Sequence, residues 1–281
     1  MEMQLEKQIE ITSLMKCFGK NIILEDINLT ISQGQSIAFI GHNGCGKSTL
    51  LKILSGLTIY QKGKLNYAKK LKFNYVPENF PKMAITAREY IYSVGLIEGL
   101  SKDFVVKRSN ELFQAFFMEE MVDNLIKNLS KGTIQKVNVI QAMLSKPDIL
   151  LLDEPLSGQD IASQKVFIHL INKMNEDGVT IVMSCHEDFL INAVSKTVYE
   201  IKDKNIYLSE RKGIKDRSFD VMIFRNHGIR LEELNVIDHI IKVEKVGNET
   251  KIYVNKENSD SVLRQMLSQG YELRGMYDEN I

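Results

Sequence analysis

Short apolar runs separated by amphipathic stretches recur along the first 210 residues, a pattern typical of strands that alternate with helices. Segments 7–17 and 22–32 alternate apolar and polar residues, as strands with one buried face do. Segments 36–40 and 149–152 are short apolar runs, as buried strands are, and segment 179–184 also has a strand pattern. This order predicts a mainly parallel sheet with helices on both faces and an antiparallel β subdomain near the N-terminus.

Helical patterns fill the intervals between these strands. The first predicted helix begins near Lys47 and carries an apolar stripe of Leu50, Leu51, Ile53, Leu54 and Leu57. Later elements are predicted as helices at 131–145, 160–175 and 187–194 and as strands at 71–78 and 197–202. Residues from about 84 to 145 are mostly helical in pattern and rich in Met, Phe and Leu. They predict a helical insert within the strand-and-helix core.

The chain changes character after residue 210. Segment 211–217 is charged and lacks periodicity, which predicts a linker between a large domain at 1–210 and a small one at 218–281. Within the small domain, strand patterns surround one helical pattern at 258–270. The second domain is therefore predicted to be α+β, and too small to host separate catalysis.

Composition narrows the class of protein. Of the 281 residues, 44% are hydrophobic and 26% charged, as in folded cytosolic proteins. Lys plus Arg and Asp plus Glu both total 36, so no basic excess suggests a nucleic-acid partner. Three cysteines without CxxC spacing favour a reducing compartment. The sequence shows no signal-peptide pattern and no apolar run of the ~18 residues that span a bilayer, so a cytoplasmic location is expected.

A phosphate-binding motif follows the apolar strand at 36–40. The pattern G-x-x-x-x-G-K-[ST] is matched by Gly41, His42, Asn43, Gly44, Cys45, Gly46, Lys47 and Ser48, with Thr49 next in the helix. Glycines let backbone N–H groups curl around phosphate, and the helix directs its positive end at the same point. Lys47 is expected to reach the β- and γ-phosphates of a nucleotide, and the Ser48 hydroxyl to bind Mg²⁺. The alternative is a glycine-rich turn with a solvated lysine.

Two carboxylates end the apolar strand at 149–152. Asp153 and Glu154 precede Pro155, and acidic groups at the end of a buried strand are costly unless the charge is used. A metal–phosphate site uses it: Asp153 is expected to hold Mg²⁺ through water, and Glu154 to activate the attacking water as general base. An acidic turn before Pro155 is the alternative.

With these two motifs, the chain resembles the ABC ATPase family over about residues 6–210. Leu129-Ser130-Lys131-Gly132-Thr133 is similar to the family's signature LSGGQ, with Lys131 and Thr133 as departures. The resemblance implies a phosphate-loop NTPase core in which Ser130 and Gly132 contact the γ-phosphate held by a second subunit. Two subunits would then enclose two ATP molecules. Read alone, LSKGT is a helix N-cap at Ser130.

Four further positions match the family in order. Ser157-Gly158-Gln159-Asp160 resembles the loop that crosses the dimer interface, and His186 resembles the switch histidine that bridges phosphate and general base. Phe18 stands where the family stacks an aromatic on adenine, although it also suits a strand core. Glu78 replaces the family's glutamine as a possible oxygen ligand of Mg²⁺.

The resemblance implies the ATP-binding and ATP-hydrolysing subunit of an ABC transporter. Its expected partners are an integral membrane permease on the inner face of the membrane and a second ATPase subunit, identical or different. Glu78 favours export, as in ATPases paired with six-helix permeases. Two alternatives stay open: an ABC-type ATPase outside transport, and a regulatory ATP-binding subunit with little turnover, which the departures at Glu78, Lys131 and Thr133 keep in view.

Overall fold

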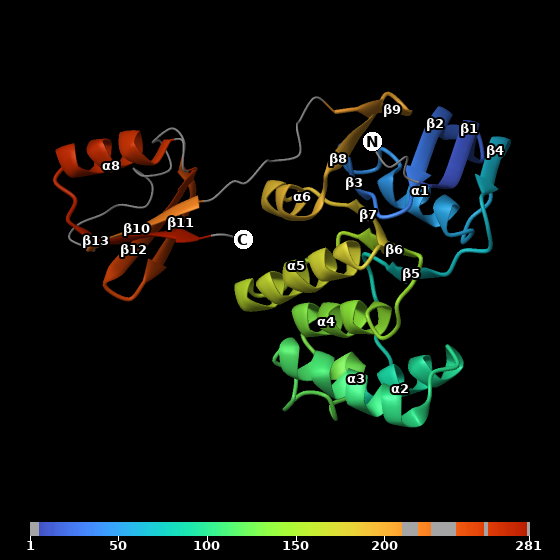
Figure 1. The fold of residues 1–281 in the computed structure, drawn as a ribbon, viewed down its shortest axis with the longest axis horizontal. Helices are drawn as coiled ribbons and strands as arrows, with labels where there is room; N and C mark the ends of the chain where they lie inside the picture. The colour runs from blue at the N-terminus through green and yellow to red at the C-terminus, as the bar shows by residue number, and fades with distance from the viewer. Residues whose placement is uncertain (1–5, 210–218, 226–239, 256–257, 280–281) are drawn as a thin grey trace. The chain divides into compact units, whose positions relative to one another are not determined.

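The computed structural model describes residues 6–209, 219–225, 240–255 and 258–279 (Figure 1). The chain divides into two compact units, Met1–Gly213 and Ile214–Ile281. The linker predicted at 211–217 lies outside the described residues.

The centre of the first unit is a six-stranded sheet in the order β5-β6-β7-β3-β8-β9. Its strands are β5 (Phe73–Val76), β6 (Ile149–Asp153), β7 (Thr180–Ser184), β3 (Ser36–Ile40), β8 (Thr197–Lys202) and β9 (Asn205–Leu208). All neighbours pair in parallel except β9, which runs antiparallel to β8. The predicted fold class, α/β with a mainly parallel sheet, is confirmed.

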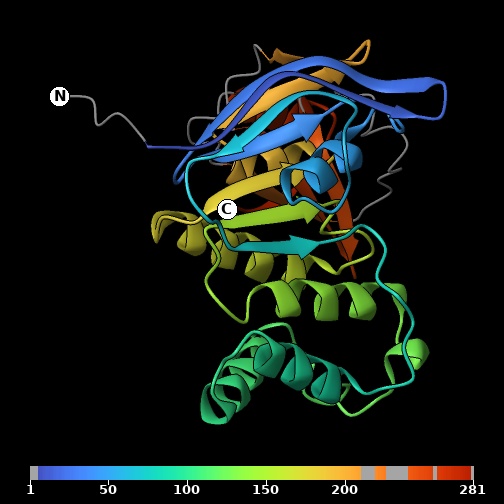
Figure 2. The ribbon, with the colours of Figure 1, turned by 90° about the vertical axis from the view of Figure 1, so that its right-hand side faces the viewer.

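Successive residues of the central strands enter two different cores. On one face, Leu151 of β6 joins α1 (Lys47–Leu54) and the N-terminal strands. On the other face, Leu152 joins α4 (Lys131–Ala142) and α5 (Ile161–Glu176). Figure 2 shows α4 stacked below the sheet, with α1 on its opposite side. Burial on both faces explains why these strands consist mostly of apolar residues.

An antiparallel sheet in the order β2-β1-β4 covers the α1 side. It consists of β1 (Lys7–Phe18), β2 (Asn21–Ser32) and β4 (Lys62–Tyr67). The prediction that Leu57 belongs to the buried stripe of α1 was wrong. The helix ends at Leu54, Gly56 turns the chain with φ of 73°, and Leu57 is 64% exposed.

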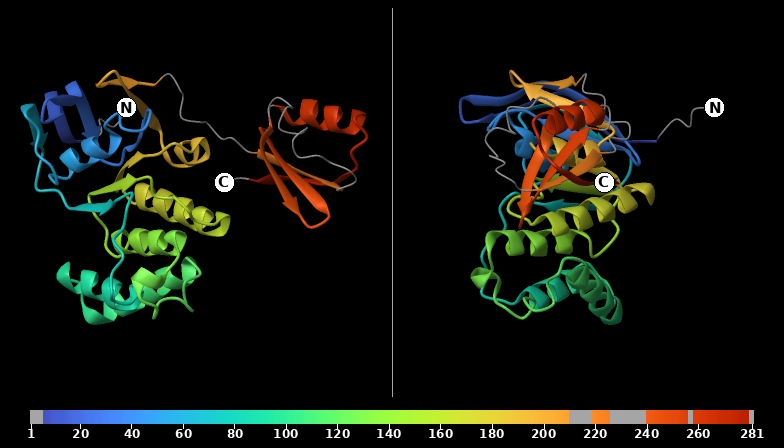
Figure 3. Two further views of the ribbon diagram at one scale, coloured as in Figure 1. Left: turned by 180° about the vertical axis from the view of Figure 1, so that it is seen from behind. Right: turned by 90° about the vertical axis from the view of Figure 1, so that its left-hand side faces the viewer.

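Helices α2 (Ala87–Ile97), α3 (Lys102–Ala115) and the 3-10 turn η1 (Ile126–Asn128) pack beside α4 (Figure 3). A capping box starts α2: Thr86 accepts from the Glu89 N–H, and the Glu89 carboxylate accepts from the Thr86 N–H. The last helix of the first unit is α6 (Asp188–Val194). In the part of the chain that the structure describes, no helix has the length and apolar character needed to cross a membrane.

The second unit is a four-stranded antiparallel sheet with one described helix. The strand order is β11 (Ile240–Val246), β12 (Glu249–Asn255), β10 (Phe219–Arg225) and β13 (Leu273–Glu279), and α8 (Ser259–Ser268) precedes β13. Met222 and Phe224 of β10 pack with Val262 and Met266 of α8. The α+β class predicted for this segment is confirmed.

We predict that a chain ending at Gly213 folds on its own. The two cores of the first unit draw their members from residues 9–206, and the third core lies within 222–273. The truncated chain should unfold in one cooperative thermal transition, followed by circular dichroism. Its midpoint should lie within about 4 °C of the first unit's midpoint in the full chain. A truncated chain without a cooperative transition would contradict the division at this point.

Candidate functional site

The loop between β3 and α1 has a backbone that favours glycine at three points. The angle φ is 143° at Gly41, 81° at Gly44 and 114° at Gly46. A Cβ at Gly41 would lie 2.5 Å from the carbonyl oxygen of Ile201. A Cβ at Gly46 would lie 2.8 Å from the Leu24 side chain. Backbone conformation and close packing together explain the glycine spacing of the motif.

This loop forms one wall of a pocket of about 540 Å³. Several strand ends supply the opposite wall, as expected where parallel strands end at one edge of a sheet. The lining residues are Ile23, Asn43, Gly44, Gly46, Lys47, Ser48, Thr49, Glu78, Glu154, Ser157, His186 and Glu187. The pocket therefore brings together the motifs that follow β3, β5, β6 and β7.

Three predicted site residues meet at the back of the loop. The Lys47 side chain is buried, and its ammonium donates to the carbonyl oxygen of Gly41 at 2.9 Å. The same Lys47 Nζ lies 3.0 Å from Nε2 of His186. Nε2 of His186 lies 3.2 Å from Oε1 of Glu154. A cation, an imidazole and a carboxylate from three elements thus form one contiguous set.

Asp153 is the most enclosed acidic group of the site. It ends β6 and is only 2% exposed. The Ser48 hydroxyl donates to its Oδ1 at 2.8 Å, so the phosphate-loop helix contacts this carboxylate directly. Two further hydroxyls, those of Ser184 and Tyr75, also donate to Asp153, and the sequence had given no sign of either.

Glu154 follows at the strand end in a strained position, with φ of 47°. Burial raises the pKa of its carboxyl to about 7, and the nearby Glu187 carboxylate adds to this rise, whereas the Lys47 ammonium opposes it. Glu187 itself lines the pocket. Its buried Oε2 has no hydrogen-bond partner among the residues that the structure describes. Glu187 was not predicted, although it directly follows His186.

The oxygen groups of this site fit a magnesium ion, although Asp153 lies behind Ser48 and does not itself line the pocket. Ser48 and Asp153 place a hydroxyl and a carboxylate 2.8 Å apart, and Glu78 lines the same pocket. Within residues 6–209 and the other described ranges, no group of three or more His, Cys, Asp or Glu could hold a metal. A cation here would complete its shell with phosphate and water oxygens, which is how Mg²⁺ is usually bound.

The segment that carries Glu78 is fixed by hydrogen bonds from side chains of α4 to its backbone. Asn138 donates its side-chain N–H to the carbonyl oxygen of Pro77 at 2.7 Å. Gln141, one turn further along α4, donates to the carbonyl oxygen of Tyr75 at 3.1 Å. The pocket wall at Glu78 is therefore tied to the helix that begins at the LSKGT motif.

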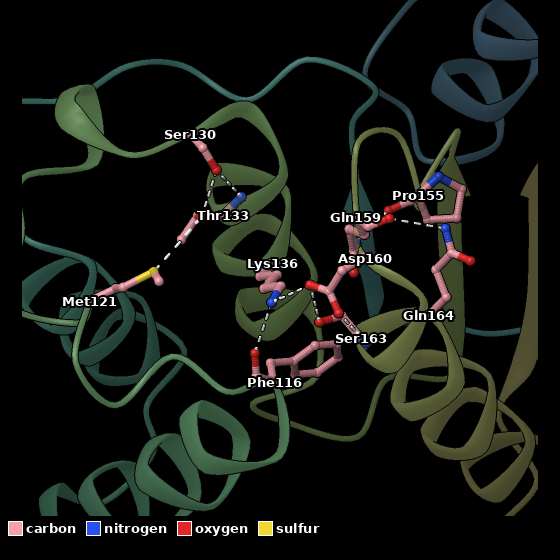
Figure 4. Close-up of polar contacts among 10 residues, drawn as sticks. All are labelled: Phe116, Met121, Ser130, Thr133, Lys136, Pro155, Gln159, Asp160, Ser163 and Gln164. Atoms are coloured by element: carbon pink, nitrogen blue, oxygen red, sulfur yellow. Dashed lines mark hydrogen bonds and ion pairs between the residues drawn. The ribbon is translucent and has the colours of Figure 1, made fainter. Parts of the chain in front are cut away.

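The LSKGT motif forms the N-terminus of α4 and does not line the pocket. Ser130 caps the helix by accepting from the Thr133 N–H at 3.1 Å (Figure 4). A Cβ at Gly132 would lie 2.1 Å from the carbonyl oxygen of Gly158. Close packing of two backbones therefore requires glycine at position 132, apart from any contact with a ligand.

Asp160 caps α5 and anchors it to α4. Its carboxylate accepts from the Ser163 N–H at 2.9 Å and pairs with the Lys136 ammonium at 2.8 Å (Figure 4). Burial acts to raise the pKa of Asp160, but the hydrogen bonds from Lys136 and Ser163 outweigh it and lower the pKa to about 2. Lys136 also donates to the carbonyl oxygen of Phe116, so one side chain links three helices.

The remaining predicted residues lie around this site. Phe18, at the end of β1, is 56% exposed, and the Lys16 ammonium lies 4.3 Å from its ring centroid. The pocket lining does not include Phe18, Ser130, Gly132 or Asp160. Asn43 and Thr49 line it, whereas Gly41, His42 and Cys45 do not. Cys45 packs into the core beside α1.

Known proteins share both the sequence and the fold. Residues 24–157 match the family model described as ABC transporter. The zinc import ATP-binding protein ZnuC of Wigglesworthia glossinidia brevipalpis is 30% identical over 226 residues, which cover 78% of this chain and 94% of that protein. The uncharacterized ABC transporter ATP-binding protein YhaQ of Bacillus subtilis (strain 168) is 26% identical over 278 residues, 94% of this chain and 92% of YhaQ. The match with YhaQ thus extends into the second unit.

Two solved structures resemble the fold. The ATP-binding subunit of an ABC transporter has a TM-score of 0.67 at 24% identity and covers 72% of this chain and 89% of its own. A dimeric ATP-binding cassette in a post-hydrolysis state, bound to ADP and phosphate, has a TM-score of 0.66 at 24% identity. It covers 74% of this chain and all of its own. Because the sequence match spans nearly all of an ATP-binding subunit and includes the phosphate loop, this chain belongs to the family of ABC transporter ATP-binding proteins, which are ATPases.

Proposed function

We propose that this pocket binds ATP with Mg²⁺ and hydrolyses it between two subunits to drive a membrane permease. One observation carries the proposal: Lys47, His186 and Glu154 form a contiguous set. This set adjoins the Ser48–Asp153 pair in the same first unit. A cation, a base and an oxygen pair for a metal are the parts that phosphoryl transfer to water needs.

The charged groups of the pocket and one exposed aromatic ring are assigned to the parts of the nucleotide. The Lys47 ammonium and the loop N–H groups neutralise and orient the phosphates. Ser48 and Asp153 hold Mg²⁺, Glu78 offers a further oxygen, and the ion when bound neutralises charge on the phosphates. Phe18 offers an exposed ring on which adenine can stack.

Glu154 is the general base of the proposed reaction. Its carboxylate takes a proton from the water that attacks the γ-phosphorus. Nε2 of His186 lies 3.2 Å from Oε1 of this carboxylate and 3.0 Å from Nζ of Lys47. The strained backbone at Glu154 supports this assignment, because such strain gathers at functional sites. Asp153 and Glu154 are adjacent but differ in role: one is fully hydrogen-bonded, and the other faces the pocket.

The second half of each site comes from another subunit in this proposal. Ser130 and Gly132 begin α4, whose positive end suits phosphate, yet they do not line the pocket of their own chain. They would contact the phosphate bound by a second subunit, identical or different, as the family resemblance implies. ABC transporter ATP-binding subunits dimerise and pair with permeases, and a relative of similar fold was solved as a dimer.

The direction of transport is not part of the proposal. The expectation of export is not supported by the comparisons, because relatives include proteins named for zinc import. We propose a location at the inner face of the membrane, reached through the permease. A gene for an integral membrane protein that adjoins the gene for this chain would encode the candidate permease. Co-expression and co-purification of the two proteins would identify it as the partner.

Replacing the proposed base should separate binding from hydrolysis. Glu154→Gln keeps the size of the side chain and removes the basic oxygen, so hydrolysis should fall by about 10²–10⁴-fold while ATP binding stays. The variant should also elute as a dimer on size-exclusion chromatography with Mg-ATP. Glu119→Gln, the same change at an exposed site, is the control and should match the wild type. Unchanged turnover in Glu154→Gln would refute the assignment, and tight ATP binding without a dimer would contradict a self-sufficient pair.

The dimer itself can be tested at the signature helix. Adding Ser130→Ala to Glu154→Gln should weaken the ATP-dependent dimer, since each hydrogen bond to phosphate contributes about 1.5–3 kcal/mol. Ser101→Ala is the matched control, because Ser101 caps α3 in the way that Ser130 caps α4. Loss of a helix cap alone would affect both variants alike. Equal dimer stability in the two variants would rule out a phosphate contact by Ser130.

A further inference from the structure

The register of the central sheet places three polar side chains on one face. In β5, β6 and β7, Tyr75 pairs with Leu151, and Asp153 pairs with Ser184. Leu151 and Asp153 are two residues apart, so their side chains share the face that packs on α1. Tyr75 packs on the same core cluster. Three strands far apart in the sequence thus direct a phenol, a carboxylate and a hydroxyl to one point under α1.

Hydroxyl groups hold both oxygens of the Asp153 carboxylate. Ser184 donates to Oδ1 at 2.6 Å, and Ser48 donates to the same oxygen at 2.8 Å. Tyr75 donates to Oδ2 at 3.0 Å. A phenol is protonated at neutral pH, so the Tyr75 hydroxyl donates to this carboxylate.

These partners satisfy the hydrogen bonds of Asp153 without neutralising its charge. In the described part of the chain, no lysine, arginine or histidine forms an ion pair with this carboxylate. A carboxylate that is 2% exposed and has only hydroxyl donors as partners suits a cation as its counter-charge. Such a cation would enter from the pocket, which the neighbouring Ser48 lines.

The two donors differ in what else they fix. Ser184 lies on the strand that leads to His186, and it is fully buried. Tyr75 lies on the strand that leads through Pro77 to Glu78, and Gln141 holds its backbone carbonyl. The Asp153 carboxylate therefore accepts hydrogen bonds from the two neighbouring strands, which lead to His186 and to Glu78.

We propose that Tyr75 and Ser184 are positioning residues for the magnesium carboxylate, holding Asp153 in the orientation in which it binds Mg²⁺ together with Ser48. The inference rests on the proposed Mg-ATP site and adds two residues that no motif of the sequence marks. Tyr75, Ser184 and Asp153 lie behind the residues that line the pocket, and the hydrogen bond from Ser48 joins Asp153 to the lining. Partners of this kind typically change metal affinity by about 10–100-fold when they are removed.

The test is the free Mg²⁺ concentration at half-maximal binding of a non-hydrolysable ATP analogue, measured by calorimetry with the full chain. Tyr75→Phe removes only the hydroxyl and should raise this concentration about tenfold, with Ser184→Ala acting in the same direction. Binding of the analogue in EDTA, without Mg²⁺, should stay at the wild-type level in both variants. This second readout separates positioning of the ion from general damage to the pocket.

Tyr67→Phe is the matched control, since its hydroxyl donates to the carbonyl oxygen of Leu54 at 2.9 Å, away from Asp153. It should keep the wild-type Mg²⁺ dependence. A Tyr75→Phe variant with wild-type Mg²⁺ dependence, or with equal loss of binding in EDTA, overturns the inference. Analogue binding that is independent of Mg²⁺ in the wild type overturns the proposed function, and the inference with it.

Discussion

One buried negative charge, that of Asp153, organises the edge of the central sheet. Enclosing a carboxylate costs several kcal/mol unless its oxygens are hydrogen-bonded and its charge is used. Here Ser48 and two strand hydroxyls satisfy the oxygens, and the described residues supply no paired cation. The fold bears this cost at the point where the glycine-rich loop brings the N-terminus of α1 against the sheet. Such an arrangement suits the cation and the phosphate of the proposed Mg-ATP site.

The sequence predicted those parts of the site that lie in one contiguous segment. Lys47 and Ser48 stand in a loop motif, Asp153 and Glu154 at the end of one apolar run, and His186 at the end of another. The structure brings these residues together, and their roles stay predictions. Tyr75 and Ser184 were missed because only the parallel register of β5, β6 and β7 joins them to Asp153. Strands β4 and β9 were missed because their sequences carry few buried apolar residues.

Helix α4 joins the pocket to the segment expected to face a second subunit. Its buried side chains Gln135 and Asn138 donate to the carbonyl oxygens of Pro155 and Pro77, which adjoin Glu154 and Glu78. Its N-terminus packs Gly132 against Gly158. Because buried amides are costly to leave unpaired, α4 and both loops are held in one arrangement. These contacts are present even though the chain departs from the family signature at Lys131 and Thr133.

The most direct test asks whether the charge of Asp153 serves the reaction or the fold. Asp153→Asn keeps an oxygen that can accept from Ser48 and Ser184 and removes the charge. Its NH₂ group replaces the oxygen that accepts from Tyr75, and the Tyr75 oxygen can accept from that group in turn. Hydrolysis of Mg-ATP and the thermal midpoint should be measured on the same preparation. If the charge serves to bind the metal, hydrolysis should fall by about 100-fold in this variant while the thermal midpoint stays equal or rises. Hydrolysis at the wild-type rate, or a lowered midpoint, would contradict it.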